Sequence, residues 1–257
     1  MEGIGKAAQE AGFESWIAYG RQSNPSTSKN IRIGSKTECY EHVFETRLFD
    51  NHGLSSRHAT ISFLKDVDRI NPDLIHLHNI HGYYINYRLL FYNIIKRKVP
   101  VVWTLHDCWS FTGHCSHFML YGCDRWKSQC HDCPQKRTYP ISLLFDRSRN
   151  NYTDKRMIFT SVPNLTLVPV SYWLDNLLSQ SFFKNNIHFC IHNGINTDVF
   201  SPVSNSVIRE QMSIHQQDFI LLGVTSQWST RKGLQDFIEL SKRLSGKYKI
   251  ILIGLTK

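Results

Sequence analysis

Residues 74–107 read LIHLHNIHGYYINYRLLFYNIIKRKVPVVWTLHD. The apolar runs Leu74–Leu77 and Val101–Leu105 each have the length of a buried strand. Between them, Asn86–Lys96 places apolar residues at helical spacing, and Pro100 breaks that helix. A helix that joins two apolar strands is typical of a parallel sheet, so this stretch predicts an α/β fold.

The same alternation extends outward in both directions. Polar turns, Gly12 and Asn71-Pro72 separate the elements before residue 74. We predict helices over Glu2–Ala11, Ser56–Ile70, Phe145–Ile158 and a short segment capped by Ser171, strands over Ser15–Tyr19, Leu165–Val170 and Ile187–Ile191, and a loop over Gln22–Asn30.

A polar stretch from Asn196 to Asn205, which contains Pro202, predicts a domain boundary. We therefore expect an N-terminal domain over residues 1–195 and a linker over 196–216. A second domain begins within 217–257, with a strand at Phe219–Val224, a helix at Leu234–Leu244 and a strand at Ile250–Gly254.

The composition restricts the class of protein. The chain has 257 residues, of which 41% are hydrophobic and 20% charged, and this can fill a core and excludes wholesale disorder. No apolar stretch is long enough to span a membrane, and the first residues lack the features of a secretory signal, so we expect a cytoplasmic protein. The net charge of +9 favours acidic partners. The sequence contains no block of consecutive like charges, however, so we do not expect a dedicated nucleic-acid-binding tail.

Polar residues follow the apolar runs where ligands bind in parallel sheets, at the carboxyl ends of the strands. His106 and Asp107 follow Val101–Leu105 and are the strongest catalytic candidates, because they can bind hydroxyls and phosphates or exchange protons. His78 and His81 are weaker candidates of the same kind.

The segment TSQWSTRKG, residues 225–233, places Arg231 and Lys232 at the start of a helix, and Gly233 leaves the backbone accessible. Two cations beside helix N-terminal amides favour a diphosphate. Two solvated cations on a surface helix are the alternative.

Five of the seven cysteines fall between residues 108 and 133. Four of them could form a structural zinc site that holds a long loop: Cys115, Cys123, Cys130 and Cys133. Their spacing matches no standard zinc finger, so reduced thiols or a loop cross-link are the alternatives.

Three segments resemble bacterial family-four glycosyltransferases of the GT-B architecture, in particular those that build colanic-acid-like and capsular polysaccharides. They are TLHDCWSFTGHC (104–115), the GCDRW and CHDCPQ segments within 122–135, and HNGINTDVFSP (192–202). The last contains the Asn193, Gly194 and Phe200 pattern that is common between the two domains of that family.

The resemblance implies two Rossmann-like domains, an acceptor side and a nucleotide-sugar side, and sugar transfer with retention and no active-site metal. His106 matches the histidine that contacts the donor sugar, and Lys232 matches the lysine that binds its diphosphate. The family's usual arginine is replaced after Gly223 by Val224 and Thr225, and we assign its role to Arg231. The resemblance implies that the acceptor is a polysaccharide or a lipid-linked glycan. It also implies that the protein associates peripherally with the cytoplasmic face of the inner membrane.

The chain departs from the family pattern at both ends. It begins inside the first helix, and it stops before the Glu-x7-Glu element that holds the donor. We expect the N-terminal domain to be nearly complete, the C-terminal domain only begun, and the chain alone to be weak or inactive. Two alternatives are a basic, zinc-stabilised nucleic-acid-binding protein and a non-catalytic remnant or partner of a split enzyme.

Overall fold

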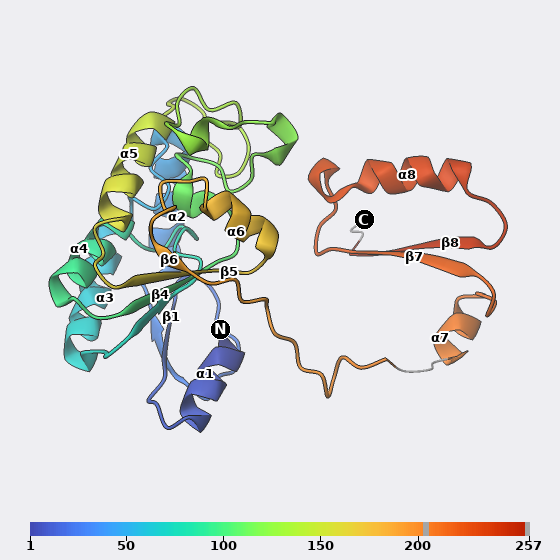
Figure 1. Cartoon of the computed structure of the whole chain (residues 1–257), viewed down its shortest axis with the longest axis horizontal. Coiled ribbons are helices and arrows are strands. Elements are labelled where there is room, and N and C mark those ends of the chain that lie inside the picture. Colours follow the sequence, from blue (N-terminus) through green and yellow to red (C-terminus); the bar gives the residue numbers. More distant parts are fainter. Residues whose placement is uncertain (203–205, 255–257) are drawn as a thin grey trace. The chain divides into compact units, whose positions relative to one another are not determined.

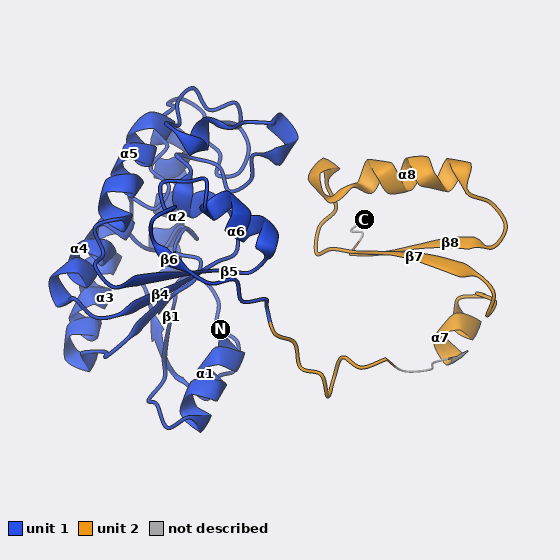
Figure 2. Ribbon diagram, in the orientation of Figure 1, with its two compact units in different colours: residues 1–193 blue, residues 194–257 orange. Residues whose placement is uncertain are grey.

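The computed structural model of the chain describes residues 1–202 and 206–254. It divides into two compact units, residues 1–193 and 194–257, which are coloured separately in Figure 2. Figure 1 gives the order of helices and strands along the chain.

The first unit alternates helices and strands. Its α-helices are α1 (Glu2–Glu10), α2 (Lys36–Phe49), α3 (Arg57–Ile70), α4 (Tyr87–Arg97), α5 (Ser148–Phe159) and α6 (Tyr172–Leu178). Its strands are β1 (Trp16–Tyr19), β2 (Lys29–Arg32), β3 (Ile75–Leu77), β4 (Val101–Leu105), β5 (Leu165–Pro169) and β6 (Ile187–His188). Three short 3-10 helices lie in the loop after β4: η1 (Trp109–Phe111), η2 (Met119–Tyr121) and η3 (Arg125–Lys127).

Every strand pairing in the described residues is parallel. The main sheet has the order β3-β4-β5-β6, and β1 pairs with β2 in a second ladder. Helices α3, α4 and α5 follow one another along one side of the main sheet (Figure 1). These features confirm the predicted Rossmann-like α/β class, which rests on βαβ crossovers.

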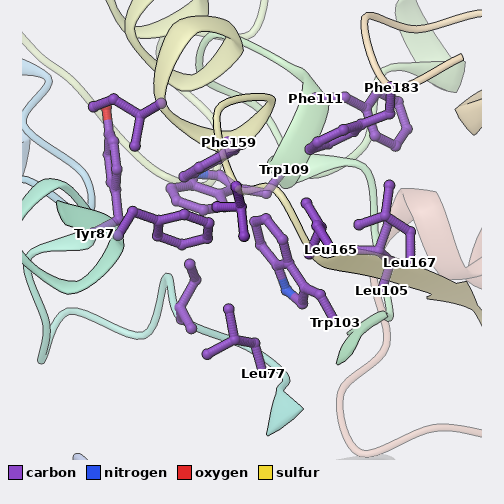
Figure 3. Close-up of a cluster of buried hydrophobic side chains, with 14 of the residues drawn as sticks. Leu77, Tyr87, Trp103, Leu105, Trp109, Phe111, Phe159, Leu165, Leu167 and Phe183 are labelled. Atoms are coloured by element: carbon purple, nitrogen blue, oxygen red, sulfur yellow. The ribbon is translucent and has the colours of Figure 1, made fainter. Parts of the chain in front are cut away.

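The core of the first unit is a group of interlocked aromatic rings. Trp103 of β4 lies 5.0 Å from Phe159 of α5 and 5.4 Å from Phe91 of α4, measured between ring centroids. Trp109 of η1 joins them at 6.4 Å from Phe159, and Figure 3 shows Trp103, Trp109 and Phe159 close together within the cluster. All four are at most 2% exposed, so the loop after β4 is packed against the sheet from its first turn.

The second unit contains α7 (Ser206–Gln211), β7 (Phe219–Val224), η4 (Thr230–Lys232), α8 (Leu234–Arg243) and β8 (Tyr248–Ile253). Strands β7 and β8 are parallel over six residue pairs, from Phe219↔Tyr248 to Val224↔Ile253. Helix α7 lies inside the stretch predicted as a linker.

Several predicted boundaries were wrong. Strand β2 begins at Lys29, inside the predicted loop, and α2 was not predicted. Strand β6 ends at His188, although the amides of Phe189 and Ile191 still donate to the Leu167 and Pro169 carbonyls of β5. Helix α5 begins at Ser148, because Asp146 accepts hydrogen bonds from nearby amides and keeps the preceding residues in a loop.

Candidate functional site

The candidate site lies at the carboxyl ends of β3 and β4. The register pairs Leu77 with Trp103, so the residues that follow the two strands emerge side by side. His78 Nδ1 lies 3.2 Å from His106 Nε2, and the two imidazole rings are stacked with centroids 5.5 Å apart. The indole of Trp103 donates a hydrogen bond to the His78 carbonyl and fixes this turn against the core.

Asp107 pairs with His81 rather than with its sequence neighbour His106. Its Oδ2 lies 3.1 Å from His81 Nε2, and its Oδ1 accepts a 2.9 Å hydrogen bond from the Trp109 amide. The Asp107 side chain is 17% exposed. A carboxylate held on both oxygens is a rigid negative charge at the edge of the sheet.

Burial works against ionisation of Asp107, but the hydrogen bond and charge of His81 and the Trp109 amide outweigh it and lower the pKa of this carboxyl. Asp107 is therefore ionised at neutral pH. Partial burial lowers the pKa of His106 despite the attraction of Asp107, so His106 is neutral there.

His76 and His78 complete a histidine stack along β3. Their rings lie 4.4 Å apart, and His76 Nε2 lies 2.8 Å from the Thr104 hydroxyl of β4. Burial, then His76 and the amino group of Met1, lower the pKa of His78 to about 3. The stack is therefore a row of neutral donors and acceptors, of the kind that bind hydroxyls. A small pocket beside it is lined by Asn79, His81, His106 and Asp107, among others.

Lys155 of α5 is 1% exposed and holds the η1 turn that follows His106 and Asp107. Its ammonium donates to the carbonyls of Trp109, at 2.8 Å, and Thr112, at 3.0 Å, and lies 3.4 Å from the Trp109 ring centroid. Burial lowers the pKa of Lys155 to about 7. No sequence signal marks it, because a lysine in a helix is ordinarily exposed.

His52 lies beneath the site in a cage of rings. Its ring is 4.7 Å from Tyr83, 5.6 Å from Trp109 and 5.7 Å from both His81 and Tyr139. It is 3% exposed, and neither of its ring nitrogens has a hydrogen-bond partner among the residues that the structure describes. Burial, together with the electrostatic effect of His81 and Lys155, therefore holds the pKa of His52 well below its usual value.

We expect His52→Phe to flatten the loss of stability in acid. The unfolded chain protonates His52 near pH 6.5 and the folded chain does not, so stability falls by about 1.4 kcal/mol per pH unit below that point. The variant should gain about 2 kcal/mol over the wild type at pH 5 and much less at pH 8. Urea unfolding at both pH values measures this, and equal gains at the two pH values would contradict it.

The predicted phosphate-binding residues lie in the second unit. Arg231 and Lys232 end η4, and Gly233, at φ +75°, precedes α8. Both cations are exposed. Trp228 fixes the preceding loop, since its indole donates to the Ile253 carbonyl at 3.0 Å and its ring packs on Phe237.

Asn193 and Gly194 lie at the division of the chain, since Asn193 ends the first unit and Gly194 begins the second. Both are exposed. The neighbouring His192 is anchored by Nδ1 at 3.2 Å from the Val170 carbonyl and by its ring against Tyr172.

The zinc prediction is not supported. Among residues 1–202 and 206–254, no group of three or more His, Cys, Asp or Glu side chains lies close enough to hold a metal ion. Cys115, Cys123, Cys130 and Cys133 are free thiols, and the Gly113 amide donates to Cys130 Sγ at 3.3 Å. The loop is instead held by buried aromatic residues, with the Trp126 ring 4.8 Å from Phe118 and 5.5 Å from Phe111.

A parallel α/β sheet with converging histidines and a carboxylate at its carboxyl edge is the arrangement of a ligand-binding α/β domain. Residues 2–199 match the family model described as Glycosyltransferase Family 4, and the chain belongs to this family. The chain is also 37% identical over 184 residues to "Putative colanic acid biosynthesis glycosyl transferase WcaC" of Escherichia coli strain K12. This match covers 66% of the chain and 44% of the relative, so the chain spans less than half of that protein's length.

Family membership confirms the resemblance inferred from the three sequence segments. It also leaves the alternative of a zinc-stabilised nucleic-acid-binding protein without support. The described helices are all too short or too polar to cross a bilayer.

Proposed function

We propose that the chain takes part in transfer of a sugar from a nucleotide-diphosphate sugar to a polysaccharide or lipid-linked acceptor, with retention of configuration. The observation that carries this proposal is the ionised Asp107, held by His81 and the Trp109 amide beside the exposed His106. The name of the Escherichia coli relative supports a polysaccharide product.

In this proposal, His106 and Asp107 have different roles. Neutral His106 forms a hydrogen bond to a hydroxyl of the donor sugar and orients it at the edge of the sheet. Glycosyl transfer passes through a state with positive charge on the sugar ring. The fixed Asp107 carboxylate stabilises that charge, and it does so without reorganising because both of its oxygens are already held.

The donor side is assigned to residues 217–257, and the acceptor side to residues 1–195, with 196–216 between them. Arg231 and Lys232 bind the diphosphate together with the backbone at Gly233. We also assign Asn193 and Gly194 to binding of the nucleotide-sugar donor. We place the protein peripherally on the cytoplasmic face of the inner membrane, where a lipid-linked acceptor is available.

The donor assignment is tested by calorimetric titration of the full chain with UDP and GDP. We expect Lys232→Gln to weaken binding of the accepted nucleotide about tenfold, because it removes a charge-assisted contact to phosphate. The matched control is Lys242→Gln, which removes an exposed lysine from the last turn of α8. Equal losses for both variants, or none for Lys232→Gln, would refute the assignment.

A further inference from the structure

The carboxyl edge of the main sheet carries a second group of side chains, next to the candidate site. Strand β5 pairs with β4 in a register that places Pro169 opposite Leu105. The residues that follow Pro169 therefore emerge beside His106 and Asp107. Tyr172, the first residue of α6, is 73% exposed. Neighbouring strands of a sheet lie about 5 Å apart, so this tyrosine follows a strand end one spacing away from the proposed reacting groups.

The start of α6 fixes the backbone at Tyr172. Ser171 is in an extended conformation, and its hydroxyl accepts a 3.2 Å hydrogen bond from the Leu174 amide. Leu174, Leu177 and Leu178 of this helix are buried in the core. Successive residues of an α-helix are about 100° apart, so Tyr172 lies on the side of α6 opposite these leucines. The exposure of Tyr172 therefore follows from the packing of α6.

His192 contacts the Tyr172 ring from the end of the neighbouring strand. The Ile191 amide donates a 3.1 Å hydrogen bond to the Pro169 carbonyl, so the chain after β6 continues alongside β5. The His192 and Tyr172 rings meet edge to face, with centroids 5.1 Å apart and planes at 82°. His192 Nδ1 lies 3.2 Å from the Val170 carbonyl, which holds the imidazole in place. We call Tyr172 and His192 the aromatic shelf.

The hydrogen bond to Val170 defines the chemistry of the other His192 nitrogen. A carbonyl oxygen only accepts hydrogen bonds, so Nδ1 carries the proton that it donates to Val170. In the neutral imidazole, Nε2 is then an acceptor. His192 is an exposed residue, as is Tyr172. The aromatic shelf therefore combines an aromatic ring with an acceptor for a ligand hydroxyl.

This combination fits a sugar ring. The face of an aromatic ring is electrostatically negative, and it attracts the polarised C–H bonds of a pyranose. β-Linked pyranoses of the glucose and galactose type have axial C–H bonds on one face of the ring and hydroxyls around its rim. A ring of this type stacked on Tyr172 would direct a rim hydroxyl to His192 Nε2.

A nucleobase also stacks on exposed aromatic rings, so the occupant must be chosen. The aromatic shelf belongs to the first unit, to which we assign the acceptor. The cations that we assign to the diphosphate of the nucleotide, Arg231 and Lys232, belong to the second unit. This division favours the acceptor glycan over the nucleobase.

We propose that the aromatic shelf binds a sugar ring of the acceptor glycan by stacking, and that it selects β-linked pyranoses of the glucose or galactose type. The inference rests on the glycosyl transfer proposed above and names the part of the acceptor that the first unit holds. The separation of the strand ends after β4 and β5 is comparable to the length of one sugar unit. The stacked ring therefore lies at the growing end of the glycan.

The test is saturation-transfer difference NMR of the full chain with methyl β-D-glucopyranoside and methyl β-D-galactopyranoside. We expect both glycosides to receive saturation, most strongly at the C–H protons of one ring face. Sorbitol, which has the hydroxyls without a ring face, should receive about tenfold less. Tyr172→Leu should weaken binding of both glycosides about fivefold, because it removes the aromatic face and keeps an apolar side chain. Tyr172→Phe should bind as the wild type does, because the ring remains.

Two further variants separate stacking from general effects on the surface. His192→Leu removes the acceptor nitrogen and should weaken binding of the glycosides about threefold. The matched control is Tyr92→Leu, which removes a tyrosine that is 55% exposed on α4. It should bind as the wild type does, and circular dichroism melting checks that all variants fold.

The proposal fails if neither glycoside receives more saturation than sorbitol, or if Tyr172→Leu binds both glycosides as the wild type does. It also fails if Tyr92→Leu or Tyr172→Phe loses as much binding as Tyr172→Leu. Titration of Tyr172→Leu with UDP and GDP is the second arm, and weakened nucleotide binding with unchanged glycoside binding would assign the shelf to the nucleobase. Neither arm requires sugar transfer, so the aromatic shelf and the proposed function can fail independently.

Discussion

Replacing Asp50 with alanine is expected to lower the free energy of unfolding by about 4 kcal/mol. Asp50 ends α2 in the left-handed conformation and is completely buried. Its Oδ1 lies 2.6 Å from His114 Nδ1, and its Oδ2 accepts from the Arg147 amide at 2.8 Å. Its carbonyl accepts from the Asn151 side chain, so one residue joins α2, the cysteine-containing loop and α5.

The reason for the large effect is what the substitution leaves behind. Burial opposes the charge on His114, but the hydrogen bond and charge of Asp50 raise the pKa of its imidazole above the usual value. Without Asp50, the buried His114 ring and the Arg147 amide lose their partner. Urea unfolding at pH 7 measures the change.

Asp50→Asn is the matched control, because asparagine tolerates the left-handed backbone and keeps an acceptor oxygen but removes the charge. We expect it to lose about half as much stability as Asp50→Ala. The Asp50–His114 contribution is present at low pH and is lost as pH rises through the raised pKa of His114. A loss below about 1 kcal/mol for Asp50→Ala would contradict this account of the loop.

The part of the fold that could be predicted from sequence is the part with regular apolar patterning. Segment 74–107 predicted β3, α4 and β4 to within a residue at most boundaries, because apolar strands and a helical apolar face are local signals. Helix α2 gave no such signal. It buries His42 and Thr46 and exposes Tyr40 and Phe44, so its pattern is reversed.

The candidate site could be predicted only in part. The strand end at residue 105 identified His106 and Asp107, but the partner of Asp107 depends on how the turn after β3 folds back beside β4. That turn brings His81 to Asp107 and leaves His106 beside His78. The cysteine cluster left a zinc site, reduced thiols and a loop cross-link open, and the structure has free thiols in a loop held by packing of Trp126 on Phe111 and Phe118.

Replacing Asp107 with asparagine is expected to slow sugar transfer about a hundredfold. Asparagine preserves the size of the side chain and can still accept from the Trp109 amide, so the turn should stay folded. It removes the negative charge that we propose faces the sugar ring, and it removes the carboxylate partner of His81. Circular dichroism melting should therefore show little change. Asp73→Asn is the matched control, since Asp73 is exposed and lies before the amino end of β3.

The most direct test of the proposed function is a single-turnover assay with the full chain in excess over a radiolabelled nucleotide-sugar, in the presence of a lipid-linked glycan acceptor. Enzyme in excess makes even slow transfer measurable. We predict labelled glycan from the wild type and from Asp73→Asn, and about a hundredfold less from Asp107→Asn. Labelled glycan from Asp107→Asn at the wild-type level would contradict the assignment of this site to glycosyl transfer.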